Sequence, residues 1–350
     1  MSSTVGTTGT RRRFGALRDV GTGVAAVGVK ELRGRMRGRR AFVILTLYLL
    51  LVAGFAWMVE SITERSFAGG FNSSLSASAD IGRAMFVGIM FLLTLGTLIL
   101  APASTAGAIS LEREKQTMDL LTTTPISSLA IVLGKLVSAL SWIFLLLFAS
   151  IPVVALVFTF GGVAPEDVLR AYVVLFVTAI VFGSMGLFIS ALVKRTQAAT
   201  VINLVLMIAL TAGTAFIFVF WVAMTGSSGF LPDQPTRDDN PLTSLTRRPP
   251  EAIMWLDPFV AQVDVLCGTE TGFGTWCQLI AGITNKDGAF IDNGNGGAFG
   301  VRRDTYWPRS LLAMSVLAVI LILLSVQLVS PTRRWRIRRP RRRSPTVGDA

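Results

Sequence analysis

Residues 110–135 read SLEREKQTMDLLTTTPISSLAIVLGK, and the first half of this stretch carries charges of both signs. It lies between two long apolar runs, in a chain that is 52% hydrophobic and only 15% charged. Ordinary soluble domains carry about 25% charged residues, so the composition is that of a membrane protein. Because ionised side chains are costly inside hydrocarbon, the charged part of this stretch is expected at a membrane surface.

A short amphipathic helix is predicted over residues 110–124. Its apolar positions recur at helical spacing: Leu111, Met118 and Leu121. Ser110 can serve as its N-cap, and the carboxylates of Glu112 and Glu114 lie in the first turn, where they interact favourably with the helix dipole. Pro125 disfavours helical geometry in the residue before it and so ends the element. A helix this short needs a bilayer surface or a protein partner to hold it.

The run EREKQTMDLLTTTPI at residues 112–126, followed by LGK at 133–135, resembles the ABC-2 type permeases. These are the membrane subunits of one large group of ATP-binding-cassette transporters. In that family the stretch follows the second membrane helix and contacts the ATPase subunit. This chain departs from the usual pattern at Gln116, where a glycine is common. The resemblance also takes in a basic arm before the first helix and a count of six membrane helices.

The resemblance implies that the 110–124 helix is a coupling helix that docks an ATPase. Polar contacts are expected from four charged residues: Glu112, Arg113, Glu114 and Lys115. Residues that would fill a groove of the ATPase are Thr117, Met118 and Leu121. The alternative is a helix that lies at the lipid interface with its charges solvated. Anionic lipid favours purely basic faces, so the mixed charges favour docking.

Six apolar runs are long enough to span a bilayer as helices, since about 20 residues cross a hydrocarbon core of about 30 Å. They cover Ala41–Val59, Ala84–Ala108, Leu136–Phe160, Ala171–Val193, Ala198–Met224 and Leu311–Val329. Pro102 and Pro152 fall inside the second and third runs and are expected to kink them or end them early. The sequence therefore predicts an all-α integral membrane protein with six transmembrane helices.

The net charge of +12 raises the possibility of nucleic-acid binding, but the position of the charges argues against it. Ten of the 33 Lys and Arg lie between Arg11 and Arg40, and eight lie between Arg333 and Arg343. Both groups flank predicted membrane helices, as the positive-inside rule requires of cytoplasmic segments. We therefore expect both termini in the cytoplasm, no nucleic-acid partner, and contact of the basic residues with anionic lipid.

The loops agree with this topology. Acidic residues outnumber basic ones in the loops over 60–80 and 165–170, which then lie outside, whereas 112–135 and 194–195 lie inside. Residues 1–29 have a composition typical of disorder and lack the apolar core of a secretory signal peptide. Residues 30–40 form either an interfacial segment with Leu32 and Met36 toward lipid or a stop-transfer charge cluster. The predicted parts are a basic arm (1–40), a transmembrane domain (41–332) and an Arg-rich tail (333–350).

A polar segment at residues 225–309 separates the last two spans and is predicted to lie outside, with seven basic and ten acidic residues. Asp257 followed by Pro258 is typical of an N-cap and a first helical residue. Apolar residues then repeat at helical spacing: Phe259, Val260, Val263 and Leu266. A short amphipathic helix is expected here, either dipping into the outer leaflet or covering the end of the membrane domain. Both cysteines of the chain fall in this segment, and an external location allows either a disulfide or two free thiols at Cys267 and Cys277.

Several kinds of chemistry are absent from the sequence. There is no histidine, no metal-binding pattern and no phosphate-binding loop of the type that binds ATP. The six runs contain no ionisable residue that could relay protons in a coupled carrier. Polar residues inside them, such as Asn203 and Gln327, are interpreted as hydrogen-bonding between helices. A row of small residues on the fourth run is interpreted as close helix packing: Ala179, Gly183, Gly186 and Ser190.

The function favoured by the residues and the resemblance together is the permease subunit of an ABC-2 type exporter in the cell membrane. The chain binds no cofactor itself on this hypothesis, whereas a separate cytoplasmic ATPase holds ATP and Mg²⁺, and a second permease copy or paralogue completes the complex. The alternative is a non-transport membrane protein: a scaffold, or an enzyme acting on lipid-linked substrates. Such an enzyme would have to use loop carboxylates, the candidates being Asp238, Asp239 and Asp257.

Overall fold

The computed structural model describes residues 39–67, 74–116, 128–225, 251–266 and 306–329, and every regular element in these ranges is helical. Six helices are long and apolar enough to cross a membrane. They are α2 (Arg39–Phe67), α3 (Ser74–Ala106), α6 (Ser128–Ala155), α8 (Pro165–Leu192), α9 (Thr196–Thr225) and α13 (Trp307–Val329). The predicted all-α class and the six spans are confirmed for the described part of the chain.

The helices of the second and third spans each end within about a turn after a proline, in agreement with the predicted early ends. Pro102 lies in the last turn or so of α3, which ends at Ala106, and Pro152 lies close to the end of α6 at Ala155. A proline lacks the N–H that would donate to the carbonyl four residues earlier, so it weakens the last turns of each helix. After α6 the chain forms the short helix α7 (Val157–Phe160).

Two glycines turn the chain from α7 into α8, and the second also permits a close approach to α3. Gly161 and Gly162 have φ values of 81° and 82°, a region that favours glycine. A Cβ atom on Gly162 would lie 2.4 Å from the carbonyl oxygen of Ala79 in α3. Arg83 of α3 donates from Nε to the carbonyl oxygen of Gly162 (3.0 Å). The α7–α8 turn is therefore fastened to α3.

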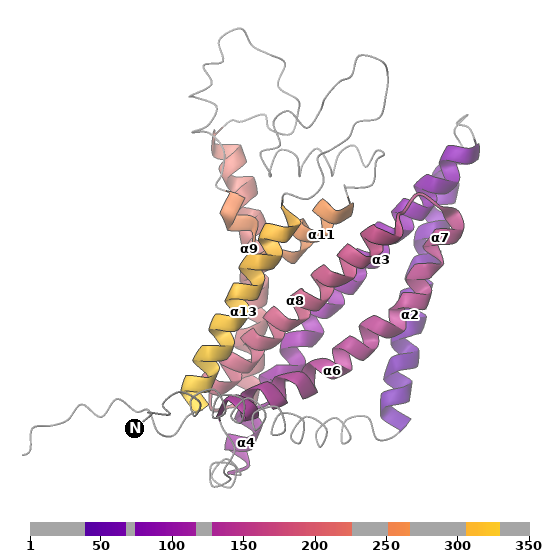
Figure 1. Ribbon diagram of the computed structural model, residues 1–350. Coiled ribbons are helices and arrows are strands. Elements are labelled where there is room, and N and C mark those ends of the chain that lie inside the picture. The colour runs from indigo at the N-terminus through magenta and orange to yellow at the C-terminus, as the bar shows by residue number, and fades with distance from the viewer. Residues whose placement is uncertain (1–38, 68–73, 117–127, 226–250, 267–305, 330–350) are drawn as a thin grey trace, which may run out of the picture.

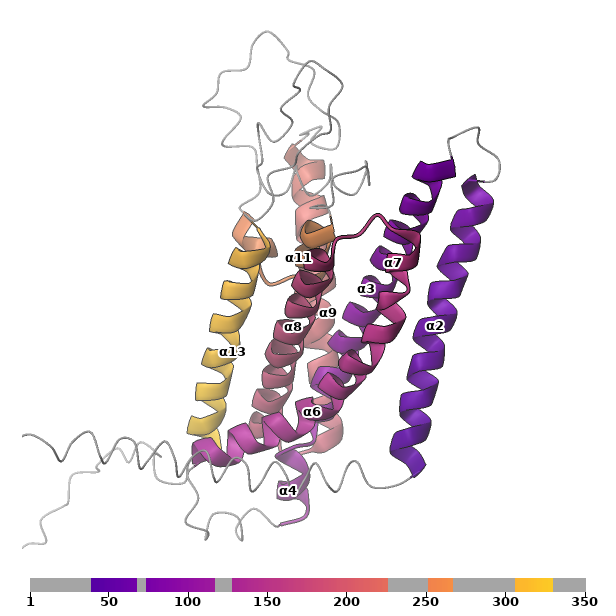
Figure 2. The ribbon, with the colours of Figure 1, turned by 45° about the vertical axis from the view of Figure 1, so that its right-hand side comes forward.

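Helix α8 is the central element of the bundle (Figures 1 and 2). Of its most apolar stretch 72% is buried, against 11% for α2 and 17% for α9. It packs against α3, α6, α9 and α13. The predicted close packing of its small residues is confirmed at two positions. A Cβ on Gly183 would meet Leu140 Cδ2 at 2.7 Å, and a Cβ on Gly186 would meet Thr105 Oγ1 at 2.1 Å.

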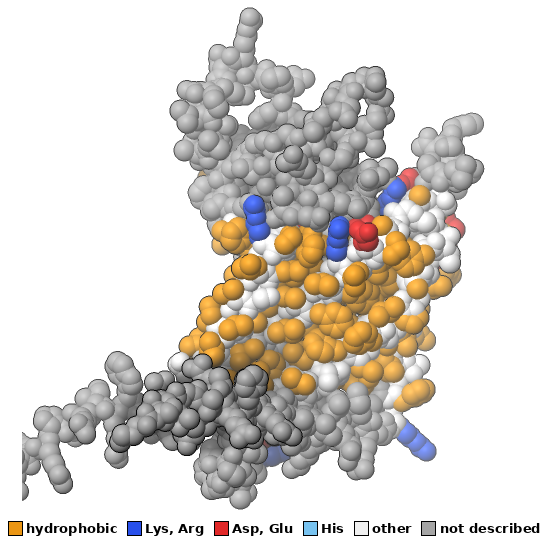
Figure 3. All heavy atoms as spheres, viewed as in Figure 1, with side chains coloured by type: hydrophobic (Ala, Val, Ile, Leu, Met, Phe, Trp, Pro, Cys, Tyr) orange, Lys and Arg blue, Asp and Glu red, His pale blue; other side chains and the backbone are white. Residues whose placement is uncertain are grey.

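Hydrophobic side chains form a broad belt across the face of the bundle shown in Figure 3, and charged side chains lie above and below this belt. Over the described residues as a whole, the exposed large apolar side chains come mainly from the less buried helices α2, α9 and α13. Apolar surface of this extent is unfavourable in water, whereas it matches the hydrocarbon of a bilayer. The chain is a multi-pass membrane protein.

One end of the bundle carries three features that the sequence analysis assigned to one side of the membrane. The start of α2, the end of α13 and the short helix α4 (Ser110–Glu114) lie at this end. The helix α11 (Pro258–Leu266) and the 3₁₀ turn η1 (Glu251–Met254) lie at the opposite end. This arrangement is the one that an even number of crossings produces.

Helix α11 begins as predicted and packs on the end of the bundle. Pro258 is its first residue, and the backbone N–H of Phe259 donates to Asp257 Oδ1 (2.9 Å), so Asp257 caps the helix. The helix packs against α8, α13 and α3. The backbone N–H of Trp307 donates to Asp264 Oδ2 (3.0 Å), which joins α11 to the start of α13. This packing agrees with the predicted placement over the end of the membrane domain.

The cap residue Asp257 predicts a pH dependence of stability. Only 2% of its surface is exposed, and this burial raises the pKa of its carboxyl from 3.8 to about 6. The folded state therefore binds the proton more tightly than the unfolded state, and stability falls as pH rises from about 4 through 6. The loss above pH 6 is roughly 3 kcal/mol by linkage.

Asparagine can still accept the hydrogen bond from Phe259 but does not ionise. We therefore expect Asp257→Asn to raise the thermal unfolding midpoint in detergent at pH 8 and to raise it about half as much at pH 5, where roughly half of the linkage loss is already present, as followed by tryptophan fluorescence. Glu64→Gln, a matched change at an exposed position of α2, should leave the difference between pH 5 and pH 8 as in the wild type. Equal pH profiles for Asp257→Asn and the wild type would contradict this account.

Candidate functional site

The candidate site is α4, which follows α3 after a turn at residues 107–109. Helical hydrogen bonding resumes when the N–H of Leu111 donates to the carbonyl of Gly107 (3.2 Å). Helix α4 ends at Glu114, earlier than the predicted helix over 110–124. Residues 117–124 lie outside the described residues, so the rest of that helix stays a prediction.

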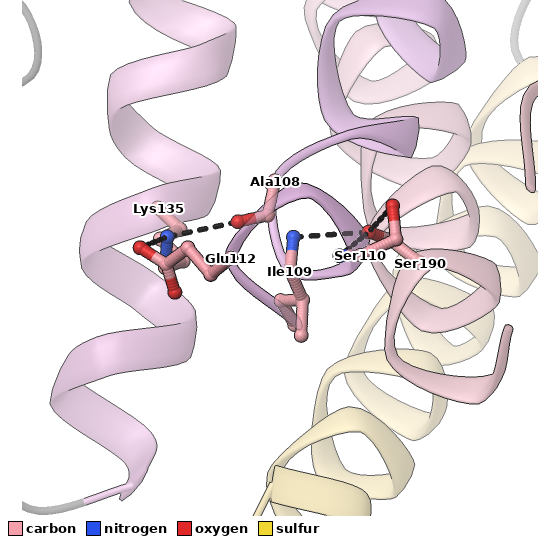
Figure 4. Close-up of polar contacts among 6 residues, drawn as sticks. All are labelled: Ala108, Ile109, Ser110, Glu112, Lys135 and Ser190. Carbon is pink, nitrogen blue, oxygen red and sulfur yellow. Dashed lines mark hydrogen bonds and ion pairs between the residues drawn. The ribbon is translucent and has the colours of Figure 1, made fainter. Parts of the chain in front are cut away.

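The N-terminus of α4 is capped by a residue of another helix. Ser190 of α8 accepts hydrogen bonds on Oγ from the backbone N–H groups of Ile109 and Ser110, both at 3.0 Å (Figure 4). The prediction that Ser110 is the N-cap is wrong, because Ile109 holds that position and the Ser110 hydroxyl donates to the carbonyl of Ala106 (3.0 Å). α3 ends so close to α4 that this carbonyl lies within reach of the hydroxyl.

A buried ion pair joins α4 to α6. Lys135 donates from Nζ to Glu112 Oε1 (2.6 Å) and to the carbonyl oxygen of Ala108 (2.8 Å), as Figure 4 shows. The Lys135 side chain is only 4% exposed. The sequence analysis began the third span at Leu136 and placed Lys135 in a loop, whereas α6 begins at Ser128 and contains it. That boundary was wrong because the presence of a charge was taken as the limit of the helix.

The next two charged residues of α4 join it to the α8–α9 turn. Arg113 donates from a guanidinium nitrogen to the carbonyl oxygen of Ala191, near the end of α8 (2.7 Å). Glu114 accepts two hydrogen bonds from Thr196, the first residue of α9, one from its backbone N–H (2.8 Å) and one from its hydroxyl (2.9 Å). A carboxylate at a helix N-terminus is favourable for the free N–H groups there. α4 is thus attached to α6, α8 and α9.

The four charged residues predicted for docking therefore divide into two groups. Glu112, Arg113 and Glu114 contact other helices of the same chain, whereas the Lys115 side chain is exposed. Leu111 is also exposed, although it is a large apolar residue. The other predicted docking residues, Thr117, Met118 and Leu121, lie outside the described residues, as do Cys267 and Cys277.

The bundle of six spanning helices, with a charged helix anchored after the second span, matches a known family of membrane proteins. A family model described as ABC-2 family transporter protein matches residues 25–330. The chain belongs to the ABC-2 family of transporter proteins. Members are transmembrane permease subunits, distinct from the ATPase, and they generally work with a cytoplasmic ATP-binding-cassette ATPase. No curated protein matched the chain in a sequence search.

The position at which this ABC-2 permease departs from the resemblance has an unusual backbone conformation. Gln116 has a φ of 56°, and its N–H donates to the carbonyl of Arg113 (3.2 Å) just after the end of α4. A left-handed residue after a helix is commonly glycine, because other residues are strained there by about 1 kcal/mol. The conformation explains why a glycine suits this position, and the glutamine adopts it at that cost.

The structure places three further candidate residues of the permease, and two others lie outside the described residues. Asn203 is 1% exposed, and neither atom of its amide has a hydrogen-bond partner among the described residues, so the predicted bond between helices is not formed there. Gln327 of α13 is exposed on the bundle surface. Asp257 is occupied as the cap of α11, and Asp238 and Asp239 lie outside the described residues.

Proposed function

We propose that this permease transmits the force of ATP hydrolysis from a separate ATPase subunit into the membrane, with α4 and the residues up to Thr124 as the coupling segment. One observation carries the proposal: α4 is fixed to α6, α8 and α9 by charged and hydroxyl side chains, while Leu111 and Lys115 stay exposed at the end of the bundle. A segment that is bound to three helices of the bundle on one side and is exposed on the other is suited to receive force from a partner subunit.

The docking contacts in this proposal come from the exposed side of α4 and from the residues that follow it. Leu111 offers an apolar contact, Lys115 offers a positive charge, and the Glu114 carboxylate is exposed enough to accept a further hydrogen bond. Glu112 and Arg113 contribute by fixing the position of α4. Thr117, Met118 and Leu121 follow as the groove-filling residues, in the manner of a helix that binds in a groove.

The orientation follows from charge. The end of the bundle that carries α4 also carries the start of α2 and the end of α13. The chain segments adjoining these two ends hold ten and eight basic residues in the sequence, which favours the cytoplasmic side for this end. The proposed location is the cell membrane, with α4 accessible to a cytoplasmic ATPase.

The remaining parts of the proposal rest on the family. The active complex contains two ATPase subunits, which bind ATP and Mg²⁺, and a second permease copy or paralogue. The direction of transport is outward. ATP-driven closure of the ATPases moves the coupling segments and switches the pathway between inward and outward access.

The test is co-purification after co-expression with a candidate cytoplasmic ATP-binding-cassette ATPase from the same genome. The double variant Leu111→Asp, Lys115→Glu places acidic groups where an apolar and a basic contact are proposed, and we expect at least a tenfold loss of co-purified ATPase, which corresponds to about 1.4 kcal/mol. Both residues are exposed, so the variant should fold.

Lys194→Glu is the matched control, because it reverses an exposed charge at the same end of the bundle but outside α4. It should retain the ATPase. Undiminished complex formation by the double variant would refute docking at α4. Failure of the wild-type chain to bind this ATPase or another ATP-binding-cassette ATPase would refute the proposed function as a whole.

A further inference from the structure

The buried pair Lys135–Glu112 is an unusual feature for the inside of a membrane protein. The lysine side chain is 4% exposed and the glutamate side chain 24%, and their nearest atoms are 2.6 Å apart. Burying an ion pair removes two charges from water, so a well-packed apolar pair at the same place would often be as stable or more so. Stability alone is therefore a weak reason for a lysine at this position in α6.

The contacts of Lys135 join three parts of the chain at one atom. Its ammonium binds Glu112 in α4 and also the carbonyl of Ala108, which lies in the turn between α3 and α4 (Figure 4). Hydrogen bonds between charged groups in a poorly hydrated environment are short, strong and directional. If α4 moved and α6 did not, these hydrogen bonds would break and the ammonium group would lose its partners. A displacement of α4 is therefore expected to move α6 with it.

Helix α6 extends this connection across the molecule. It begins at the end of the bundle that carries α4 and runs obliquely to α7 at the other end (Figures 1 and 2). The turn after α7 is fastened to α3 through the contact of Gly162 with Ala79 and the hydrogen bond from Arg83. Movement of α6 at its start can thus reach the opposite end of the membrane domain.

We propose that Lys135 is the positioning residue that transmits displacement of α4 to α6 through Glu112 and Ala108. This inference rests on the proposed function, in which an ATPase displaces α4. The attachments through Arg113 and Glu114 tie α4 to the ends of α8 and α9, whereas Lys135 ties it to the interior of a helix. In this arrangement Lys135 is required for coupling and takes no part in ATPase docking.

The experiment measures the distance between spin labels at Leu47 of α2 and Val137 of α6, both exposed, in the complex with the co-purified ATPase. Cys267 and Cys277 are replaced by serine so that only the introduced cysteines are labelled. We expect ATP to shift the distance distribution in the wild type. Lys135→Met should abolish this shift while the amount of bound ATPase stays the same. Lys135→Arg, which keeps the charge and the donors, should retain it.

Lys194→Met is the control, since it removes an exposed lysine from the same end of the bundle; its ATP-dependent shift should equal that of the wild type. If Lys135→Met does not accumulate, Glu112→Gln tests the same link by removing the charge of the partner, and a reduced shift is expected.

An unchanged shift in the tested variant overturns the inference. So does an absent shift in a wild-type complex that binds ATP, or a loss of the ATPase from Lys135→Met, which would assign the lysine a structural role only. In the first two of these cases the proposed docking still stands, whereas a wild-type chain that binds no ATPase refutes the proposed function itself.

Discussion

Replacing Gly186 with valine is expected to destabilise the membrane domain by about 3 kcal/mol, the upper part of the usual range for overpacking. Even a single Cβ atom at this position would lie 2.1 Å from Thr105 Oγ1 and 2.8 Å from the backbone carbonyl oxygen of Pro102. The hydroxyl could rotate away, although it would then lose its hydrogen bonds to the carbonyls of Ala101 and Pro102. The backbone atom cannot rotate, so α3 and α8 would have to separate.

The measurement is the thermal unfolding midpoint in detergent, with a fall of about 5–10 °C expected for this loss of stability. Gly213→Val in α9 makes the same chemical change at a position where a Cβ would meet nothing within 4 Å, and its midpoint should stay close to the wild-type value. Gly186→Ala should show a smaller fall than Gly186→Val. Equal midpoints for Gly186→Val and Gly213→Val would show that α3 and α8 do not pack closely at Gly186.

Removing the hydroxyl of Ser190 is expected to release the start of α4 from α8. The backbone N–H groups of Ile109 and Ser110 both donate to this oxygen, and Ile109 and Ser110 are buried. A buried donor that loses its partner costs about 1–3 kcal/mol, so the two together give about 2–6 kcal/mol in Ser190→Ala. The loss acts locally on α4, because the other contacts of α8 do not involve this hydroxyl.

Hydrogen exchange of the segment covering residues 107–116 is the suitable measurement, because it reports local opening. We expect its exchange in Ser190→Ala to be at least tenfold faster than in the wild type, and Ser190→Thr, which keeps the oxygen, to exchange more slowly than Ser190→Ala. The matched control is Ser184→Ala on the same helix, since Ser184 donates only to the carbonyl of Val181 in its own helix. If Ser190→Ala and Ser184→Ala exchange alike, the hydroxyl of Ser190 does not hold α4.

The features that follow from local rules could be predicted from the sequence. Each membrane span must be long and apolar by itself and must satisfy its own backbone hydrogen bonds, so six helices could be recognised one at a time. The same holds for the early ends at Pro102 and Pro152 and for the cap of α11, where Asp257 accepts from a residue two positions later. The charged stretch after the second span was found for the same reason.

The role of each charge in that stretch was decided only by the tertiary structure. Glu112 meets Lys135 across 23 residues, and Ser110 meets Ser190 across 80. The sequence analysis assigned all four charges of residues 112–115 to a partner, whereas three of them contact other helices of the same chain. Hydrocarbon sets the length and polarity of each span separately, but which helix ends adjoin depends on side-chain packing such as that of Gly183 and Gly186 around α8. That packing brings a lysine of α6, a serine of α8 and a threonine of α9 to one short helix, and no local pattern in the sequence predicts their meeting.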